Sequence, residues 1–132
     1  MPTLSSPPKQ RAAARPAHAN HAGELAAIVQ SSYDAIIAKT LDGVVTAWNG
    51  GAERVFGYSA AQAIGRPLLR LIVPATQQDE ERQILARVAR GEVVSGFETR
   101  RRRRDGSTLD VSVTVSPIRN AEGAVIGAAK TV

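Results

Sequence analysis

Apolar and polar residues alternate strictly through the last third of the chain, and this pattern predicts β-strands. In LDVSVTVS (residues 109–116) every second residue is apolar, so one face of the strand should be buried while the other stays polar. The segment EVVSGFETR (residues 92–100) is its expected partner across an Asp-Gly turn. Pro117 should end this strand, and AVIGAAKTV (residues 124–132) is expected to form the last one.

Two shorter strands are predicted nearer the N-terminus. AIIAKT (residues 35–40) and VVTAWN (residues 44–49) flank a Leu-Asp-Gly turn, and Asp-Gly is the strongest short signal for a β-hairpin. Alternation along the second strand places Val44, Thr46 and Trp48 on one face. With the three C-terminal strands, these two make five.

Helical spacing of apolar residues replaces the alternation between the two sets of strands. A short helix is predicted over Ala52, Val55 and Phe56, with Asn49 as its N-cap and a glycine at its C-terminus. The segment SAAQAIG, which begins at Ser59, repeats this arrangement in a smaller form. Helices this short are unstable alone, so we expect them to pack against the sheet.

A longer helix is predicted from near Thr76 to Arg90, where Ile84, Leu85 and Val88 form the expected buried stripe. The sequence therefore predicts an α+β fold. Its five-stranded antiparallel sheet should be flanked by several short helices and one longer helix, with an N-terminal amphipathic cap helix before the first strand.

The first turn of the longer helix contains three consecutive acidic residues, Asp79, Glu80 and Glu81. An acid/base pair or a metal site is one interpretation, but consecutive helical residues point in different directions. We expect instead surface charges that match the helix dipole. The sequence then offers no set of catalytic side chains that would support the interpretation as an enzyme.

The N-terminal part of the chain divides into two segments. Residues 1–23 are rich in proline, alanine and serine without an apolar period, so we expect a mobile lead-in. A single domain is predicted over residues 24–132. It begins with the amphipathic cap helix, because Leu25, Ile28 and Val29 fall on one side of a helix.

Composition excludes several kinds of site. The chain of 132 residues has no cysteine, which rules out disulfides, thiolate catalysis and cysteinyl flavin adducts. Apolar runs stay shorter than the roughly 18 residues of a membrane-spanning helix. We therefore expect a cytoplasmic protein, with no membrane contact from this segment.

The formal net charge is +5, and the five arginines at 100–104 contribute strongly to it. A phosphate contact surface is one interpretation, since each neutralised phosphate strengthens binding. No aromatic residues interleave with the arginines, so we expect a solvated hairpin without a nucleic-acid partner. A three-residue loop would set Phe97 on the valine face, Arg102 opposite Asp110, and Arg101 at the margin of the apolar face.

Several short motifs occur together in an order that resembles the PAS domain, a sensory module of bacterial histidine kinases and related signalling proteins. The resemblance covers roughly residues 24–132. It rests on Trp48-Asn49, Phe56-Gly57-Tyr58, Ile64-Gly65, Asp105-Gly106 and Ser116-Pro117-Ile118. No single motif is specific, but together the ordered set is a strong signal.

The resemblance implies a module that dimerises and relays a small-ligand or conformational signal to an effector outside this chain, such as a histidine kinase. A ligand-free interaction and dimerisation domain is the alternative. Neither is an enzyme. The expected surface for a homodimer is the apolar stripe of Leu25, Ile28 and Val29.

The same resemblance implies a cavity between the short helices and the sheet. Heme-binding relatives use a histidine on the long helix, and none stands there, so we expect no heme; a small, largely apolar ligand or none is expected instead. We interpret Trp48 as a core residue and not as a surface on which a ligand stacks. The candidate lining residues are Ile37, Trp48, Phe56, Leu71, Val111 and Val113.

Overall fold

The structure is a computed structural model that describes residues 23–132, so the predicted lead-in lies outside the described residues except for Gly23. Two units are distinguished, with their boundary after Ser31. Residues 23–31 of the first unit form a helix, where the amphipathic segment was predicted. The second unit, Ser32–Val132, contains the rest of the predicted elements.

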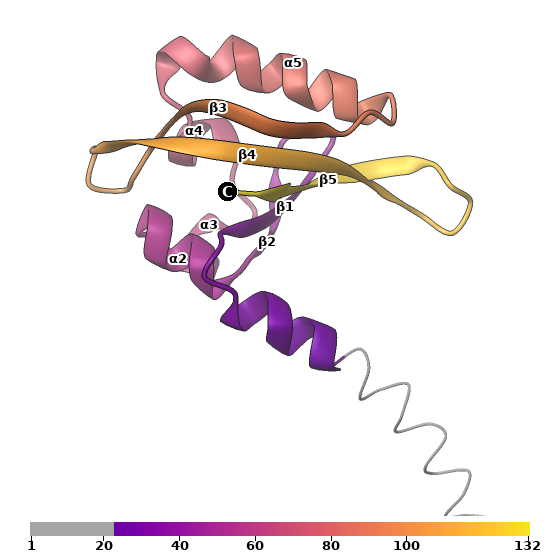
Figure 1. The fold of residues 1–132 in the computed structure, drawn as a ribbon, viewed down its shortest axis with the longest axis horizontal. Coiled ribbons are helices and arrows are strands. Elements are labelled where there is room, and N and C mark those ends of the chain that lie inside the picture. The colour runs from indigo at the N-terminus through magenta and orange to yellow at the C-terminus, as the bar shows by residue number, and fades with distance from the viewer. Residues whose placement is uncertain (1–22) are drawn as a thin grey trace, which may run out of the picture. The chain divides into compact units, whose positions relative to one another are not determined.

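The second unit contains a five-stranded sheet in which every neighbouring pair is antiparallel, as the alternating pattern predicted (Figure 1). The strand order across the sheet is β2-β1-β5-β4-β3, so the first and last strands of the unit lie side by side in its middle. The strands are β1 (Ile36–Thr40), β2 (Val45–Trp48), β3 (Val94–Arg102), β4 (Thr108–Arg119) and β5 (Val125–Thr131).

The helices connect β2 to β3. They are α2 (Gly50–Phe56), α3 (Ala60–Ala63), α4 (Leu68–Ile72), the 3₁₀ turn η2 (Ala75–Gln77) and α5 (Gln78–Ala89). The longest, α5, contacts β3, β4 and β5, whereas α2 and α3 contact β1 and β2 (Figure 1). The predicted α+β fold, with several short helices and one longer helix beside an antiparallel sheet, is confirmed.

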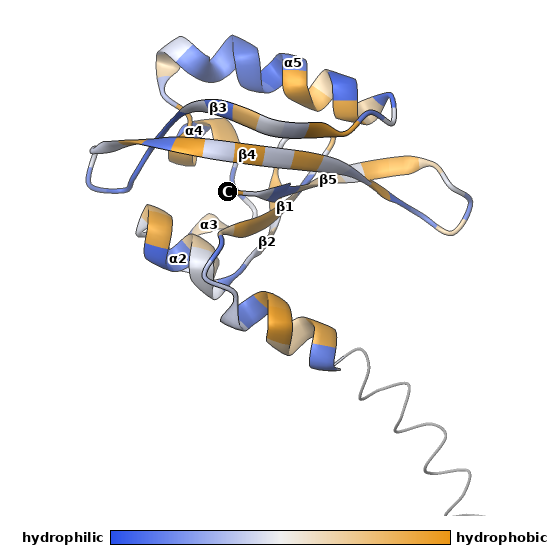
Figure 2. Ribbon diagram, viewed as in Figure 1, coloured by the Kyte–Doolittle hydropathy of each residue, from blue (hydrophilic) through white to orange (hydrophobic). Residues whose placement is uncertain are grey.

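Helix α5 is amphipathic, and Figure 2 shows hydrophilic and hydrophobic turns along it beside hydrophobic bands spaced along β4. Ile84 and Val88 are buried as predicted, and Leu85 is half-buried. Glu81 joins this buried side with an exposed fraction of 2%, although it was predicted to be a surface charge. The reason is its position, three residues before Ile84 and so on the same face of the helix.

Asn49 holds the start of α2 against β1. Its Oδ1 accepts hydrogen bonds from the backbone N–H of Ala52 at 2.9 Å and of Ile36 at 2.8 Å, and its Nδ2 donates to the carbonyl of Asp34 at 3.1 Å. The predicted N-cap is thus confirmed, and it also joins two elements. Gly51 is required beside it, because a Cβ there would lie 2.1 Å from the Asp34 carbonyl oxygen.

The prediction that Val44, Thr46 and Trp48 share one face of β2 is wrong. Val45 and Trp48 are buried, whereas Thr46 and Ala47 are exposed. In the pairing with β1, Ala47 lies opposite Ala38 and Val45 lies opposite the next residue, so Thr46 is an extra residue in the ladder. Such a bulge shifts the alternation by one position, which strict period-two reasoning misses.

The hairpin between β3 and β4 has an odd-length loop, as predicted, but its register differs. Phe97 lies opposite Val113, on the valine face. Five residues, 103–107, separate the strand ends where three were predicted, so Arg100 and not Arg102 lies opposite Asp110.

Strand β4 continues through Pro117 to Arg119, so the predicted strand end at Pro117 is wrong. Pro117 pairs with Ala128 of β5, but it lies beyond the last pair with β3, Val94 opposite Val115. On the β3 side the strand is therefore an edge at this point. A proline, which lacks an N–H, is tolerated at such a position.

Candidate functional site

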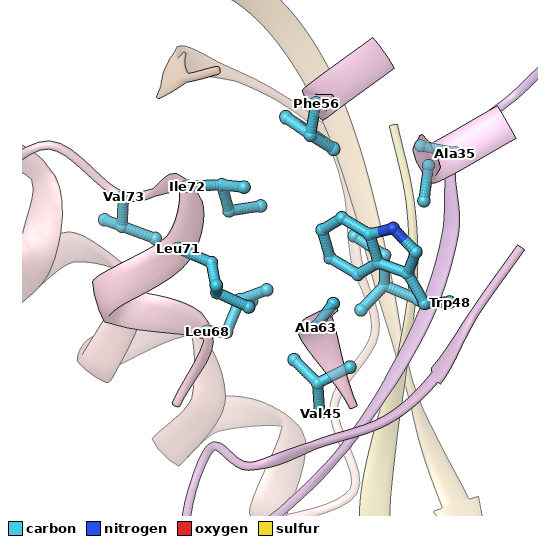
Figure 3. Close-up of a cluster of buried hydrophobic side chains, with 11 residues drawn as sticks. Ala35, Val45, Trp48, Phe56, Ala63, Leu68, Leu71, Ile72 and Val73 are labelled. Atoms are coloured by element: carbon cyan, nitrogen blue, oxygen red, sulfur yellow. The ribbon is translucent and has the colours of Figure 1, made fainter. Parts of the chain in front are cut away.

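A buried apolar cluster lies between the short helices and strands β1 and β2. Trp48 stands in it (Figure 3), with its ring centroid 5.8 Å from that of Phe56 and 6.4 Å from that of Tyr58. Its indole N–H donates to the Tyr58 carbonyl at 2.9 Å. With only 4% of its surface exposed, Trp48 is a core residue.

The structure brings four of the six predicted cavity residues into this one cluster: Ile37, Trp48, Phe56 and Leu71. Val113 is also fully buried but is not a member of it. Val111 is half-buried and lies opposite Thr99 of β3. Their role as ligand contacts stays a prediction.

Next to the apolar cluster, four charged side chains from four different elements meet in the interior. Glu81 of α5 accepts a hydrogen bond from Lys39 of β1 at 2.6 Å and one from the Arg101 guanidinium of β3 at 2.8 Å. Lys130 of β5 also donates to Glu81. Each of the four has at most 2% of its side-chain surface exposed. We call these residues the charge cluster.

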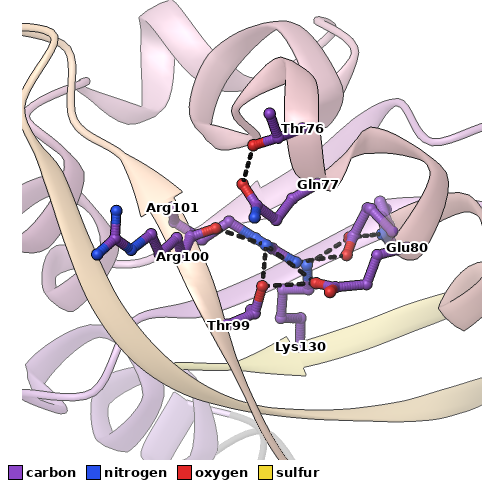
Figure 4. Close-up of polar contacts among 9 residues, drawn as sticks. Thr76, Gln77, Glu80, Thr99, Arg100, Arg101 and Lys130 are labelled. Carbon is purple, nitrogen blue, oxygen red and sulfur yellow. Dashed lines mark hydrogen bonds and ion pairs between the residues drawn. The ribbon is translucent and has the colours of Figure 1, made fainter.

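Arg101 has further polar partners at the edge of the charge cluster (Figure 4). Its Nη1 donates to the Thr99 hydroxyl at 3.2 Å and to the Arg100 carbonyl at 2.7 Å, and it lies 3.8 Å from the carboxylate of Glu80. Thr99 in turn donates to Glu80 at 2.5 Å. The Nε of Arg101 is a buried atom without a hydrogen-bond partner among residues 23–132.

The protonation of the charge cluster follows from burial and pairing. Burial raises the pKa of Glu81, but the charges of Lys130 and Lys39 outweigh it and hold that pKa far below its ordinary value of 4.5. Burial lowers the pKa of Lys130 from 10.5 to about 7, opposed by the attraction of Glu81 and reinforced by Lys39 and Arg101. Glu81 therefore stays ionised, while Lys130 titrates near neutral pH.

Two sequence predictions are corrected here. Glu81 is not a surface charge matched to the helix dipole but the single anion of the charge cluster; Asp79 remains exposed and pairs with Arg82 at 2.9 Å. The arginine run is not uniformly solvated, because Arg101 has 0% of its surface exposed. Its neighbour Arg100 does behave as predicted, since its side chain is 63% exposed.

The sequence contained a signal for the charge cluster. Lys39 follows the buried Ile37 by two residues, and Lys130 follows the buried Ala128 by two, so both share the inward face of their strands. Arg101 lies two residues after Thr99 on the side of β3 that faces α5. Charged residues at inward positions of three strands, with a carboxylate on the facing helix, indicate a buried ion-pair network.

The predicted dimer residues lie on the helix of the first unit. Leu25 is 51% exposed, Ile28 63% and Val29 40%. Within the described residues, no three His, Cys, Asp or Glu side chains gather closely enough to hold a metal ion. Among residues 23–132, no helix combines the length and apolar character that a membrane crossing requires.

Comparisons with known proteins agree with the architecture. An uncharacterised protein of Azorhizobium caulinodans is 33% identical over 97 residues, which cover 70% of this chain. The chain spans only 13% of the length of that relative.

Among solved structures, the PAS domain of a protein from Colwellia psychrerythraea has a TM-score of 0.74 at 28% identity, covering 83% of this chain and 92% of that chain. A domain of the sensory box sensor histidine kinase/response regulator from Geobacter sulfurreducens has the same fold, with a TM-score of 0.67 at 18% identity, covering 84% of this chain and 91% of that chain. The PAS fold family matches residues 23–132. The chain therefore belongs to the PAS family.

Proposed function

We propose that this PAS domain is a sensory module, which dimerises and relays a small-ligand or conformational signal to an effector outside this chain. The observation that carries the proposal is its fold, since the similar domain from Geobacter sulfurreducens belongs to a sensory box sensor histidine kinase/response regulator. A relative of which the chain spans 13% is consistent with a module of a larger protein. A histidine kinase is the proposed effector.

The exposed stripe of Leu25, Ile28 and Val29 supports a homodimer, with a second copy of the same helix as the partner. Apolar residues three and four positions apart share one side of a helix. A helix of this length is marginally stable alone in water, so its order should come from a contact along that side. A second copy presents the same stripe and covers it with matching chemistry.

Light scattering on the full chain tests the dimer. Ile28→Asp places a charge in the stripe and should weaken the dimer by tenfold or more, whereas Gln30→Asp adds the same charge to a polar position of the same helix and should not. A dimer that tolerates Ile28→Asp as well as Gln30→Asp would show that the interface lies elsewhere.

A ligand-free interaction domain is the second candidate, and the packing of the apolar cluster favours it. Trp48 and Phe56 lie against each other, and neither exceeds 4% exposure. Native mass spectrometry of the purified protein separates the two candidates. A small molecule retained in stoichiometric amount supports sensing of a ligand, and its absence supports signalling through conformation alone.

A further inference from the structure

A pocket of about 380 Å³ opens between the β1–β2 turn, the start of α4 and one side of α5. This volume falls within the roughly 300–1,000 Å³ typical of small-molecule sites. The turn and α4 are joined by a hydrogen bond from the Leu68 N–H to the Gly43 carbonyl at 2.9 Å. Its lining is Lys39, Leu41, Asp42, Gly43, Pro67, Leu68, Leu69, Glu81, Arg82, Leu85, Ala86 and Ala89.

The lining combines apolar walls with a buried ion pair. Most of the lining residues are leucine, alanine or proline, whereas Lys39 and Glu81 belong to the charge cluster and are each 2% exposed. The two other charged lining residues, Asp42 and Arg82, are exposed and opposite in sign. The pocket therefore reaches the residues of the buried ion pair, whose side chains are themselves at most 2% exposed.

Lys39 has hydrogen-bonding capacity left for a ligand. An ammonium group offers three donors, and within residues 23–132 that of Lys39 donates to Glu81 alone, at 2.6 Å. A ligand oxygen that reached this ammonium would use a second donor without breaking the bond to Glu81.

The charge cluster carries more positive than negative charge. Lys39, Arg101 and Lys130 surround the single buried carboxylate of Glu81. Lys130 titrates near neutral pH, but even with Lys130 neutral the cations Lys39 and Arg101 outnumber this one buried carboxylate; Glu80, 33% exposed, lies 3.8 Å from Arg101. An uncompensated charge in the interior is costly. An anion placed beside Lys39 would reduce the excess, and an apolar or cationic molecule would not.

We propose that this pocket binds a small amphipathic carboxylate, with its anionic group beside the Lys39 ammonium and its hydrocarbon part against the leucines of the turn, α4 and α5. The one other cation of the lining, Arg82, is exposed and already pairs with Asp79, which favours one carboxylate over a phosphate or a dicarboxylate. The proposal names the ligand class for the sensory function proposed above and rests on it.

Octanoate is the probe, octanamide its uncharged match and acetate the charged group without the hydrocarbon chain. Titrations of the full chain, monitored by calorimetry and by amide NMR shifts, should show saturable binding of octanoate. This binding should be at least about tenfold tighter than that of octanamide. Acetate should bind more weakly still. The largest shifts should fall on the β1–β2 turn and α5.

Two variants and one matched control test where octanoate binds. Lys39→Met should weaken octanoate binding tenfold or more and remove its preference over octanamide. Ala86→Phe fills the pocket from an exposed position of α5 and should have a similar effect on affinity, whereas Gln83→Phe, outside the lining, should not.

Equal affinity for octanoate and octanamide, unchanged binding to the Ala86→Phe variant, or no saturable binding would each overturn the proposal. The dimer measured by light scattering is a separate readout. Loss of the carboxylate site with an intact dimer contradicts this inference alone, whereas loss of the dimer contradicts the proposed sensory module.

Discussion

Replacing Glu81 with glutamine should destabilise the domain more than any other single change of one charge. The amide keeps the size of the side chain but removes the only anion among the three buried basic side chains of the charge cluster. Removing one partner of a buried ion pair costs about 3–5 kcal/mol. A domain of this size has a free energy of unfolding of about 5–15 kcal/mol, so a large fraction of it would be lost.

The expected shift in melting temperature follows from that cost. At about 4–8 °C per kcal/mol for a small domain, Glu81→Gln should melt roughly 12–40 °C below the unmodified chain. Circular dichroism and the fluorescence of Trp48, the only tryptophan, both report the transition. Urea titration at fixed temperature gives the same difference as a free energy.

Glu80→Gln is the matched control. This carboxylate is 33% exposed and lies 3.8 Å from Arg101, so its replacement should cost about 0–1 kcal/mol. The pH dependence adds a second check. Pairing lowers the pKa of Glu81 in the folded state. The contribution of Glu81 to stability is therefore fully present above pH 4.5 and is lost as the pH falls below that value. Equal melting temperatures for Glu81→Gln and Glu80→Gln would refute the reasoning.

Three further changes test other parts of the structure. Asn49→Ala removes the cap of α2 and its bond to β1, and should cost about 1–3 kcal/mol in urea unfolding. Arg101→Ser should lower the melting temperature far more than Arg100→Ser, whose exposed ion pair contributes about 0–1 kcal/mol; equal effects would mean that Arg101 is solvated. Because the pKa of Lys130 is lowered from 10.5 to about 7 on folding, the unfolded state binds more protons between these values, and stability should rise with pH there. Urea midpoints from pH 7 to pH 9 should show this rise, and Lys130→Met should lack it.

The fold was largely predictable because its signals are local. Alternation marked the strands, and Asn49 marked the start of α2 through a cap on the Ala52 N–H, three residues away. The errors in β2 and at Pro117 arose where one residue departs from a regular ladder. Thr46 is an extra residue in its strand, and Pro117 pairs on one side only. Such irregularities depend on the neighbouring strand, which sequence patterning does not specify.

The charge cluster was less predictable because no segment contains more than one of its members. Lys39, Arg101 and Lys130 lie on three strands that the sheet order brings together beneath α5. In the sequence, Arg101 stands among other arginines and Glu81 among other acids, so each looks like part of a solvated run. Only the strand order and the register of β3 separate the buried member of each run from its exposed neighbours.

One anion shared by three cations also constrains how descendants of this gene can diverge. A lineage that loses Glu81 first must pass through a form in which the buried cations Lys39 and Arg101 have no buried carboxylate beside them, and selection removes such intermediates when they unfold. Replacing all four residues together with apolar side chains of similar volume is tolerated far better than the single steps toward it. The four positions should therefore be inherited as a set, so that orthologous domains keep all four charges or have none of them.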